Sequence, residues 1–340
     1  MTLSRINLSL SNRCNAKCIW CPTSRGTKHN FDMPKETAFK VIDEISEMST
    51  INSMFFSENG EGIYNNDFIE IVSYARQKLP NSYFNMLSNF GMMTPELSKQ
   101  ILENKLIDEF QVNIDGHDAE SYYAVKKISY RSVIKNLTQY LELRKKYHPE
   151  QMFIVNAVPA AQYAITIKSL LQTQPDQVQV EDQIPYSNLQ AIQQSLNELD
   201  EKYNLSLIRQ QSPGLWAERK TFRRTIKNMN IDQSNMNCPM FDRVKSEAFI
   251  APNGDWYPCC LDDNNDIVLG NVNTQTVQEI YTSQRRLEFV EKLKNRQYEE
   301  IGYPCNTVAC CHHNHMPKEI LQEMVKDFKP GDMINLSNNG

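Results

Sequence analysis

Three cysteines lie close together near the start of the chain, at Cys14, Cys18 and Cys21. Because this spacing is too short to reach across two structural elements, we expect the three thiols to converge from a single loop. Thiolates suit iron–sulfur clusters and zinc. The loop supplies no fourth ligand, so a four-iron cluster bound here would keep one iron open to an exogenous ligand. A zinc knuckle completed by a distant fourth ligand is the alternative.

A second group of six cysteines lies between residues 238 and 311, and no cysteine occurs between residues 22 and 237. The chain starts without the apolar run of a secretory signal peptide. We therefore expect a cytoplasmic location and cysteines that serve metal or redox chemistry rather than disulfides. Their distribution predicts two separate metal-binding regions.

Size and charge limit the function classes. The 340 residues suffice for one large domain and a smaller one. The net charge of -5 argues against a general nucleic-acid or membrane-surface binder. No apolar run approaches the length of a transmembrane helix, so neither a membrane nor a nucleic acid is an expected partner.

Strand–loop–helix units repeat through the first half of the chain. Apolar alternation or short apolar runs predict six strands, at 3–10, 51–57, 83–87, 110–114, 152–158 and 178–181, with helical patterns between them. Such repeats indicate an α/β fold with a parallel sheet. Because a closed TIM barrel has eight strands, counting alone leaves an open doubly wound sheet and a partial barrel both possible. In either case, ligands bind at the carboxyl ends of the strands.

The cysteine loop, with Trp20 directly before Cys21, resembles the signature loop of the radical S-adenosylmethionine (SAM) enzymes. In that family the methionine part of SAM chelates the open iron, and reductive cleavage of SAM gives a hydrogen-abstracting 5′-deoxyadenosyl radical. The resemblance implies a partial (β/α)6 TIM-type barrel, SAM, a SAM-binding 4Fe-4S cluster and a one-electron donor such as flavodoxin or ferredoxin. A zinc-binding interaction protein and an iron–sulfur electron carrier are the non-enzyme alternatives.

Two strand ends resemble segments that contact SAM in that family. Asn59-Gly60-Glu61 resembles its Gly-Gly-Glu-Pro motif, with Glu61 as the acceptor for the SAM amino group and Gly62 in place of proline. Ser88-Asn89-Phe90-Gly91 resembles a segment whose polar groups reach the ribose or carboxylate of SAM. For a single such motif, an ordinary turn or cap is an equally good interpretation.

Further positions match the family one by one. Asn113 stands where a serine contacts SAM, and Lys126 stands where an arginine often pairs with the SAM carboxylate. Lysine keeps the charge of arginine but not its planar fork. The resemblance also implies that Asn156 faces the nucleoside and that Trp20 shields the cluster and lines the adenine.

The second cysteine group resembles the C-terminal SPASM or shorter twitch extension of radical SAM enzymes, a small β-hairpin and helix around auxiliary clusters. The full SPASM pattern has seven cysteines, so the six found here imply a single auxiliary 4Fe-4S cluster. Its expected ligands are Cys238, Cys259, Cys305 and Cys311, with Cys310 as the alternative to Cys311 and zinc as the alternative metal. The spare thiols, Cys260 and Cys310, are candidate catalytic hydrogen-atom donors; packing is the other interpretation.

The expected domains are a radical SAM core at 1–184, a variable connecting region at 185–237, an auxiliary-cluster domain at 238–320 and a tail at 321–340. The resemblance implies hydrogen abstraction followed by oxidation or epimerisation. Because the extension is short and the first strand starts at residue 3, without a leader-binding domain before it, we expect a small polar substrate. A sugar, an aminocyclitol or a phosphorylated metabolite would fit, and peptide modification is the alternative.

Overall fold

One nine-stranded sheet organises the computed structural model, which describes residues 2–18, 21, 31–58, 60–157, 189–205, 207–210, 237–262 and 265–306. The strand order is β6-β5-β4-β3-β2-β1-β7-β8-β9. The first six strands are parallel to their neighbours, and their bounds are β1 (Arg5–Leu8), β2 (Ser53–Phe55), β3 (Tyr83–Ser88), β4 (Glu109–Asn113), β5 (Met152–Ala157) and β6 (Leu207–Gln210).

The strand order distinguishes a partial barrel from an open doubly wound sheet, which the number of strands alone could not do. Strands β1 to β6 follow one another across the sheet in sequence order, with no reversal of direction along the sheet. A doubly wound sheet reverses at a switch point, whereas a barrel winds on in one direction. Strand β1 pairs with β2 and β7 and not with β6, so the winding does not close within the described residues. The predicted partial TIM-type barrel is therefore confirmed.

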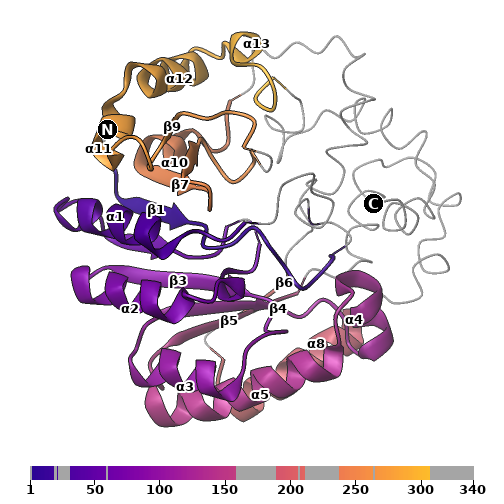
Figure 1. Ribbon diagram of the computed structural model, residues 1–340. Coiled ribbons are helices and arrows are strands. Elements are labelled where there is room, and N and C mark those ends of the chain that lie inside the picture. The colour runs from indigo at the N-terminus through magenta and orange to yellow at the C-terminus, as the bar shows by residue number, and fades with distance from the viewer. Residues whose placement is uncertain are drawn as a thin grey trace, which may run out of the picture.

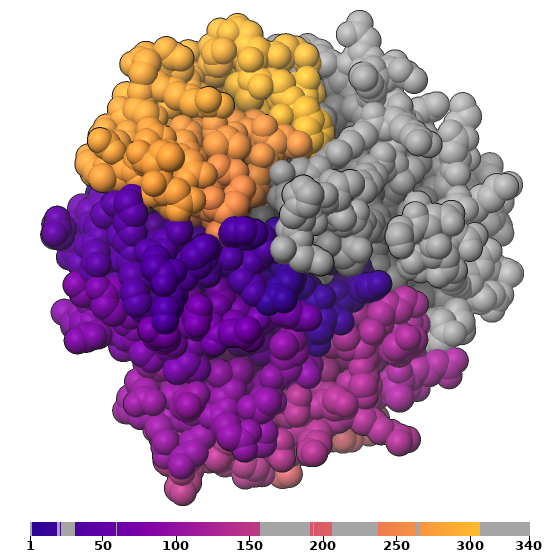
Figure 2. Space-filling view, in the orientation of Figure 1, coloured from indigo at the N-terminus to yellow at the C-terminus, as the bar shows by residue number. Residues whose placement is uncertain are grey.

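The C-terminal segment continues this sheet. Strand β7 (Glu247–Ile250) lies parallel to β1, and β8 (Asp255–Tyr257) and β9 (Gly270–Asn271) follow it antiparallel. The hairpin expected for the auxiliary domain is thus joined edge to edge to the barrel. Figure 2 shows the orange and yellow surface of this segment lying directly on the indigo surface of the N-terminal region.

The helices of the barrel form a layer on one side of the strands (Figure 1). In that layer α1 packs against α2, α2 against α3, α3 against α5, and α5 against α8. The bounds are α1 (Lys35–Ser46), η2 (Gly62–Tyr64), α2 (Phe68–Lys78), α3 (Pro95–Glu103), α4 (Ala119–Lys126), α5 (Tyr130–Tyr147), α8 (Leu189–Tyr203), α10 (Phe241–Ser246), α11 (Val277–Thr282), α12 (Gln284–Lys294) and α13 (Tyr298–Ile301). No helix of the described ranges is long and apolar enough to cross a membrane.

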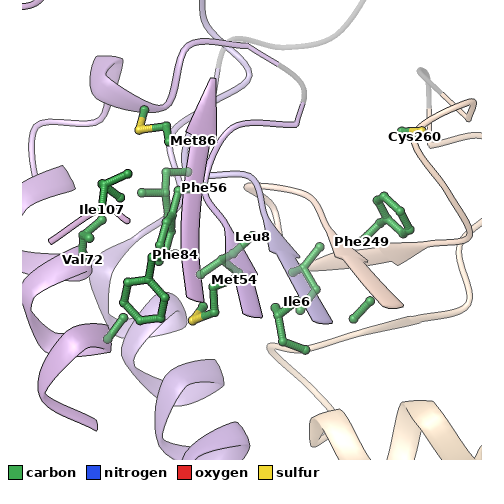
Figure 3. Packing of buried hydrophobic residues seen from close by; sticks show 14 of the residues in the cluster. Ile6, Leu8, Met54, Phe56, Val72, Phe84, Met86, Ile107, Phe249 and Cys260 are labelled. Carbon is green, nitrogen blue, oxygen red and sulfur yellow. The ribbon is translucent and has the colours of Figure 1, made fainter. Parts of the chain in front are cut away.

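The core lies between the strands and the helices. Alternate residues of β1, Ile6 and Leu8, pack there with Met54 and Phe84 and are fully buried (Figure 3). Burial of each such side chain contributes about 1.5–3 kcal/mol to folding. Because successive residues of a strand point to opposite faces, Arg5 and Asn7 face the other side of the sheet. That side carries polar groups, as the inner face of a barrel that binds a ligand would.

The first five predicted strands agree with β1 to β5 of the structure. The sixth strand of the sheet, β6, lies at Leu207–Gln210, inside the expected connecting region at 185–237. The strand expected at 178–181 lies outside the described residues. Strand β7 was not predicted as a separate strand.

Candidate functional site

The three-cysteine loop follows β1 at the carboxyl end of the barrel strands. Cys14, Cys18 and Cys21 are half-buried, and none of the cysteines in the described ranges forms a disulfide. Burial raises the pKa of the Cys14 thiol to about 12, and nearby Glu61, Cys18 and Cys21 act in the same direction. The three thiols are thus close enough for the charge of one to affect the pKa of another. A bound metal reverses the shift, because a coordinating thiol is deprotonated.

Backbone hydrogen bonds tie this loop to the segment after β2 and to the end of α4. The N–H of Glu61 donates to the carbonyl of Arg13 at 2.8 Å, and the N–H of Lys17 donates to the carbonyl of Lys126 at 2.9 Å. Gly60 allows the first contact. It has a φ of 126°, and a Cβ there would lie 2.4 Å from the carbonyl oxygen of Ser11. Glycine is thus required where the loops cross.

An ion pair anchors the base of the loop from the other side. The guanidinium of Arg13 binds the carboxylate of Asp32, with Nε donating to Oδ1 at 2.9 Å, and the hydroxyl of Ser11 donates to the same oxygen at 2.6 Å. Arg13 also lies over the ring of Tyr64, 4.3 Å from its centroid. The loop is therefore held at both ends before any metal binds.

Glu61 presents an acceptor without a partner. The residue is 2% exposed, and its Oε2 accepts the N–H of Asn89 at 2.8 Å. Its buried Oε1 has no hydrogen-bond partner within the described residues. Burial raises the pKa of this carboxyl to about 7, although Asn89, Ser88 and Lys126 lower it. A buried acceptor of this kind is suited to an ammonium group, such as the amino group of SAM.

Lys126 is paired with Asp115 behind the cysteine loop. Their charged atoms are 2.8 Å apart, and the two side chains are 4% and 0% exposed. Burial alone would lower the pKa of Lys126, but Asp115 and Cys18 raise it well above its ordinary value. The positive charge in turn lowers the pKa of Cys18, although burial raises that pKa to about 12 overall. Lys126 therefore affects the ionisation of Cys18 as well as pairing with Asp115.

The amides of β4 and β5 lie side by side. Asn113 is in register with Asn156 on the neighbouring strand. Asn156 is 2% exposed and donates from Nδ2 to Oε1 of Gln111 at 3.3 Å. The buried Oδ1 of Asn113 has no partner among the residues described. Together with Glu61 it gives the strand-end edge two unused acceptors.

The remaining strand-end residues hold the β3 loop. Ser88 is 1% exposed, and its Oγ accepts the N–H of Phe90 at 3.0 Å. The Asn89 side chain reaches the cysteine loop. The structure thus brings Glu61, Ser88, Asn89 and Lys126 around Cys14 and Cys18. Trp20, Cys310 and Cys311 lie outside the described residues.

The second cysteine group is only partly described. Cys259, Cys260 and Cys305 are buried, and Cys238 is half-buried. No three His, Cys, Asp or Glu side chains of the described part of the chain, the first cysteine loop included, are placed to hold a single metal ion. In a four-iron cluster each thiolate binds a different iron atom, so its ligands lie farther apart than the ligands of a single ion. The thiol-only donor set of both groups fits an iron–sulfur cluster.

Cys260 is buried and contacts two charged side chains. Its Sγ accepts from Nη1 of Arg243 at 3.5 Å, and its thiol is hydrogen-bonded to the carboxyl of Glu58. Glu58 is partly accessible, yet burial raises the pKa of its carboxyl to about 7 against the lowering effect of Arg243. Since Glu58 lies three residues before Glu61, Cys260 contacts the same strand-end loop that holds the predicted SAM acceptor. Figure 3 shows Cys260 beyond Phe249, on the β7 side of the sheet.

Glu247 links this group to β1, and the sequence analysis missed it. Its carboxylate accepts Nε and Nη2 of Arg243 at 2.7 and 2.9 Å and Nδ2 of Asn7 at 2.9 Å. The available signal was the polar alternation of β1, where Arg5 and Asn7 interrupt the apolar residues. Such residues indicate a polar inner face, but not which partners they meet.

Models of known protein families match both cysteine-containing regions of the chain. The family model for the radical SAM superfamily matches residues 8–154, and the SPASM model, an iron–sulfur cluster-binding domain, matches residues 238–311. The mycofactocin maturase MftC of Mycolicibacterium smegmatis is 28% identical over 119 residues, which are 34% of this chain and 29% of MftC. The chain therefore matches less than a third of the length of that relative.

Solved structures with the same fold include three different kinds of complex. Native anSMEcpe with bound AdoMet has a TM-score of 0.56 at 16% identity, covering 99% of both chains. Streptococcus suis SuiB bound to the precursor peptide SuiA has a TM-score of 0.53 at 13% identity, covering 85% of this chain and 67% of SuiB. BtrN in complex with AdoMet and 2-DOIA has a TM-score of 0.50 at 14% identity, covering 92% of both chains.

Proposed function

We propose, from the premise that the chain belongs to the radical SAM superfamily and carries a C-terminal SPASM domain, that it is a peptide-modifying enzyme. The radical SAM domain implies SAM and a 4Fe-4S cluster, and the SPASM domain implies auxiliary iron–sulfur clusters. Bound together, SAM and the first cluster supply a hydrogen-abstracting 5′-deoxyadenosyl radical. The expected electron donor is a flavodoxin or a ferredoxin.

The sequence match to MftC, a maturase, carries the choice of a peptide over a small molecule. The SuiB complex with a precursor peptide supports it at the level of the fold. This departs from our expectation of a small polar substrate, which rested on the short extension and on the position of the first strand. The fold shared with BtrN, solved with 2-DOIA, keeps that expectation as the second candidate.

We assign the cofactor-binding roles from the geometry of the strand ends. Cys14, Cys18 and Cys21 would hold the first cluster, and Oε1 of Glu61 would accept the SAM amino group. Asn113 would use its free Oδ1 toward the same ligand, and Ser88, Lys126 and Asn156 would complete the surroundings. For the auxiliary cluster the ligands stay as predicted, with Cys238, Cys259, Cys305 and Cys311.

Cys260 is the described thiol best placed for a catalytic role. It lies between Glu58 and Arg243 and beside the Glu61 loop. As a hydrogen-atom donor, it would lose its S–H bond while a C–H bond forms on the peptide, giving epimerisation. One electron from the external donor and one proton would then restore the thiol. Cys310, the other predicted donor, stays a prediction.

The test combines the reconstituted enzyme with substrates of both classes. Short peptides encoded beside this gene and a panel of aminocyclitols and sugar phosphates would be incubated with enzyme, SAM and dithionite in D2O. We expect a peptide to gain one deuterium by epimerisation, and Cys260→Ala to remove that gain. A peptide that instead loses two hydrogens would support oxidation or cross-linking. Turnover of small molecules alone would overturn the peptide assignment.

A further inference from the structure

The Asn89 side chain is directed at the cluster loop. It is 8% exposed, and its Nδ2 donates to Sγ of Cys14 at 3.5 Å and to Oδ1 of Asn15 at 2.8 Å. Its Oδ1 accepts the N–H of Gly91 at 2.7 Å. A carboxamide has two N–H donors and one carbonyl oxygen. Both donors are therefore engaged within the protein, and neither is left for a ligand.

The surroundings fix this orientation. A Cβ on Gly91 would lie 2.3 Å from Nδ2 of Asn15 and 2.9 Å from Oδ1 of Asn89. The backbone N–H of Asn89 is also used, since it donates to Oε2 of Glu61. One residue of the β3 loop thus touches both a cluster thiol and the predicted SAM acceptor.

Cys14 receives a second donor from its own loop. The N–H of Ala16 donates to its Sγ at 3.4 Å. Hydrogen bonds to the sulfurs of a cluster are among the features that set its reduction potential. Donors stabilise negative charge on sulfur. Because the reduced cluster carries one more negative charge than the oxidised one, each donor favours reduction.

We infer that Asn89 is a positioning residue that holds Cys14 and raises the reduction potential of the SAM-site cluster, and that it does not contact SAM. This replaces the role that the family resemblance implied for Asn89. The inference about Asn89 rests on the proposed function only because it requires Cys14 to be a cluster ligand. Glu61, held by the same residue, keeps the contact with SAM.

The primary test is an EPR-monitored redox titration of reconstituted wild-type protein and Asn89→Asp. The substitution keeps the size of the side chain, removes both donors and adds a negative charge, which also disfavours reduction; Asn89→Ala removes the donors without adding charge. We expect reduction of the SAM-site cluster to become about tenfold less favourable, equivalent to about 59 mV for one electron. Asn136→Ala is the matched control. Asn136 supports the same loop by donating to the carbonyl of Phe90 at 2.9 Å, and it forms no hydrogen bond with a thiol of the described residues.

The second measurement is the dissociation constant of SAM for the oxidised proteins. We expect Asn89→Asp and Asn136→Ala to bind SAM within about twofold of wild type, well below the tenfold change that 1.4 kcal/mol produces. An unchanged potential together with weaker SAM binding would overturn the inference, because Asn89 would then act on SAM. Asn89→Ala is titrated beside Asn89→Asp, and its potential should fall as well; an unchanged potential in Asn89→Ala would assign the shift in Asn89→Asp to the added charge and overturn the inference. Failure of both variants to load, with normal loading of Asn136→Ala, also supports a role in holding Cys14.

The outcome is separable from the proposed function. A wild-type protein without a SAM-responsive cluster would refute the cofactor assignment itself. A wild-type protein with such a cluster, whose potential ignores the Asn89 substitutions, would refute only the inference about Asn89.

Discussion

At the scale of single residues, the site consists of buried polar groups whose partners are incomplete or unusual. Glu61 has one carboxylate oxygen in use and one without a described partner. Lys126 and Asp115 form an ion pair with almost no exposure. Buried groups of this kind are expected where a protein prepares a binding site, because an unsatisfied polar atom destabilises the empty fold.

Glu61→Gln tests the proposed SAM acceptor. Loss of a charged acceptor for an ammonium removes about 1.5–3 kcal/mol of interaction, so the SAM dissociation constant should rise about tenfold or more. Equilibrium dialysis or calorimetry under anaerobic conditions measures it. Glu70→Gln is the control, because the Glu70 side chain is 53% exposed and pairs with Lys35. Equal affinities of wild type and Glu61→Gln would remove Glu61 from the site.

The raised pKa of Glu61 adds a pH dependence. Its pKa is about 7 in the folded protein against an ordinary value of 4.5. The native state therefore binds more protons than the unfolded state between these values, so the contribution of Glu61 to stability falls as the pH rises through that window. Because the proposed contact with the SAM amino group needs the carboxylate, SAM affinity should instead increase from pH 6 to 8. In Glu61→Gln, SAM affinity should no longer change between pH 6 and 8. If the variant shows the same pH dependence as wild type, another titrating group is responsible for it.

Lys126→Met tests the buried pair. Removing one partner of a buried ion pair leaves an uncompensated charge, and we expect the free energy of unfolding to fall by about 3–5 kcal/mol. Urea unfolding of the metal-free protein measures it, and Lys126→Met with Asp115→Leu should recover part of the loss. Lys105→Met breaks an exposed pair with Glu150 and should change stability by about 1 kcal/mol or less. If Lys126→Met and Lys105→Met lower the free energy of unfolding by similar amounts, burial of the Lys126–Asp115 pair is unimportant for stability.

At the scale of elements, local patterns predicted most of the barrel. The apolar alternation of β1 and the short apolar runs of β3 and β5 were readable because they depend on neighbouring residues. Helix caps are local in the same way: Oγ1 of Thr94 accepts the N–H of Leu97 at 3.1 Å at the start of α3. The contact of Cys260 with the Glu58 loop was not readable. It joins segments about two hundred positions apart and leaves no periodic signal in either.

Strand β7 is another feature that local sequence patterns could not predict. It is four residues long, directly follows α10 and pairs with β1. A strand this short gives little alternation to detect, and its place beside β1 is set by pairing across the sheet. The cluster loop was predictable for the opposite reason, since its ligands are neighbours in the chain.

Arg286→Met tests how the auxiliary segment is held together. The Arg286 side chain is fully buried and donates to the carbonyls of Tyr281, Val244 and Lys245 at 2.8 to 3.0 Å, joining the ends of α10 and α11. Removing it leaves buried carbonyls unsatisfied at about 1–3 kcal/mol each. We expect faster amide exchange in residues 237–306, with β3 to β5 unaffected.

The neighbouring arginine provides the comparison for that experiment. Arg285→Met changes the same residue type at an exposed position of the same helix and should leave exchange unchanged. The proposed role of Arg286 would be contradicted if both variants lost protection against amide exchange equally, or if β3 to β5 lost it first.

At the scale of the whole molecule, one sheet joins the two parts that bind cofactors. The barrel supplies the three-cysteine loop and the Glu61 end of β2, and the C-terminal segment adds β7 to β9 to the edge at β1. Through Glu247 and Arg243, this joint also holds Cys260 against the strand-end loop. The account therefore predicts that SAM chemistry and the candidate donor thiol share one site.

The most direct test of the account is the yield of 5′-deoxyadenosine from SAM and dithionite, measured on anaerobically reconstituted wild-type protein and on Cys18→Ala. We expect wild type to bind about eight irons per chain, as two four-iron clusters require, and to release 5′-deoxyadenosine. Cys18→Ala should release none while it retains the iron of the auxiliary cluster. A wild-type protein that binds zinc alone, or a Cys18→Ala protein that still cleaves SAM, would contradict the account.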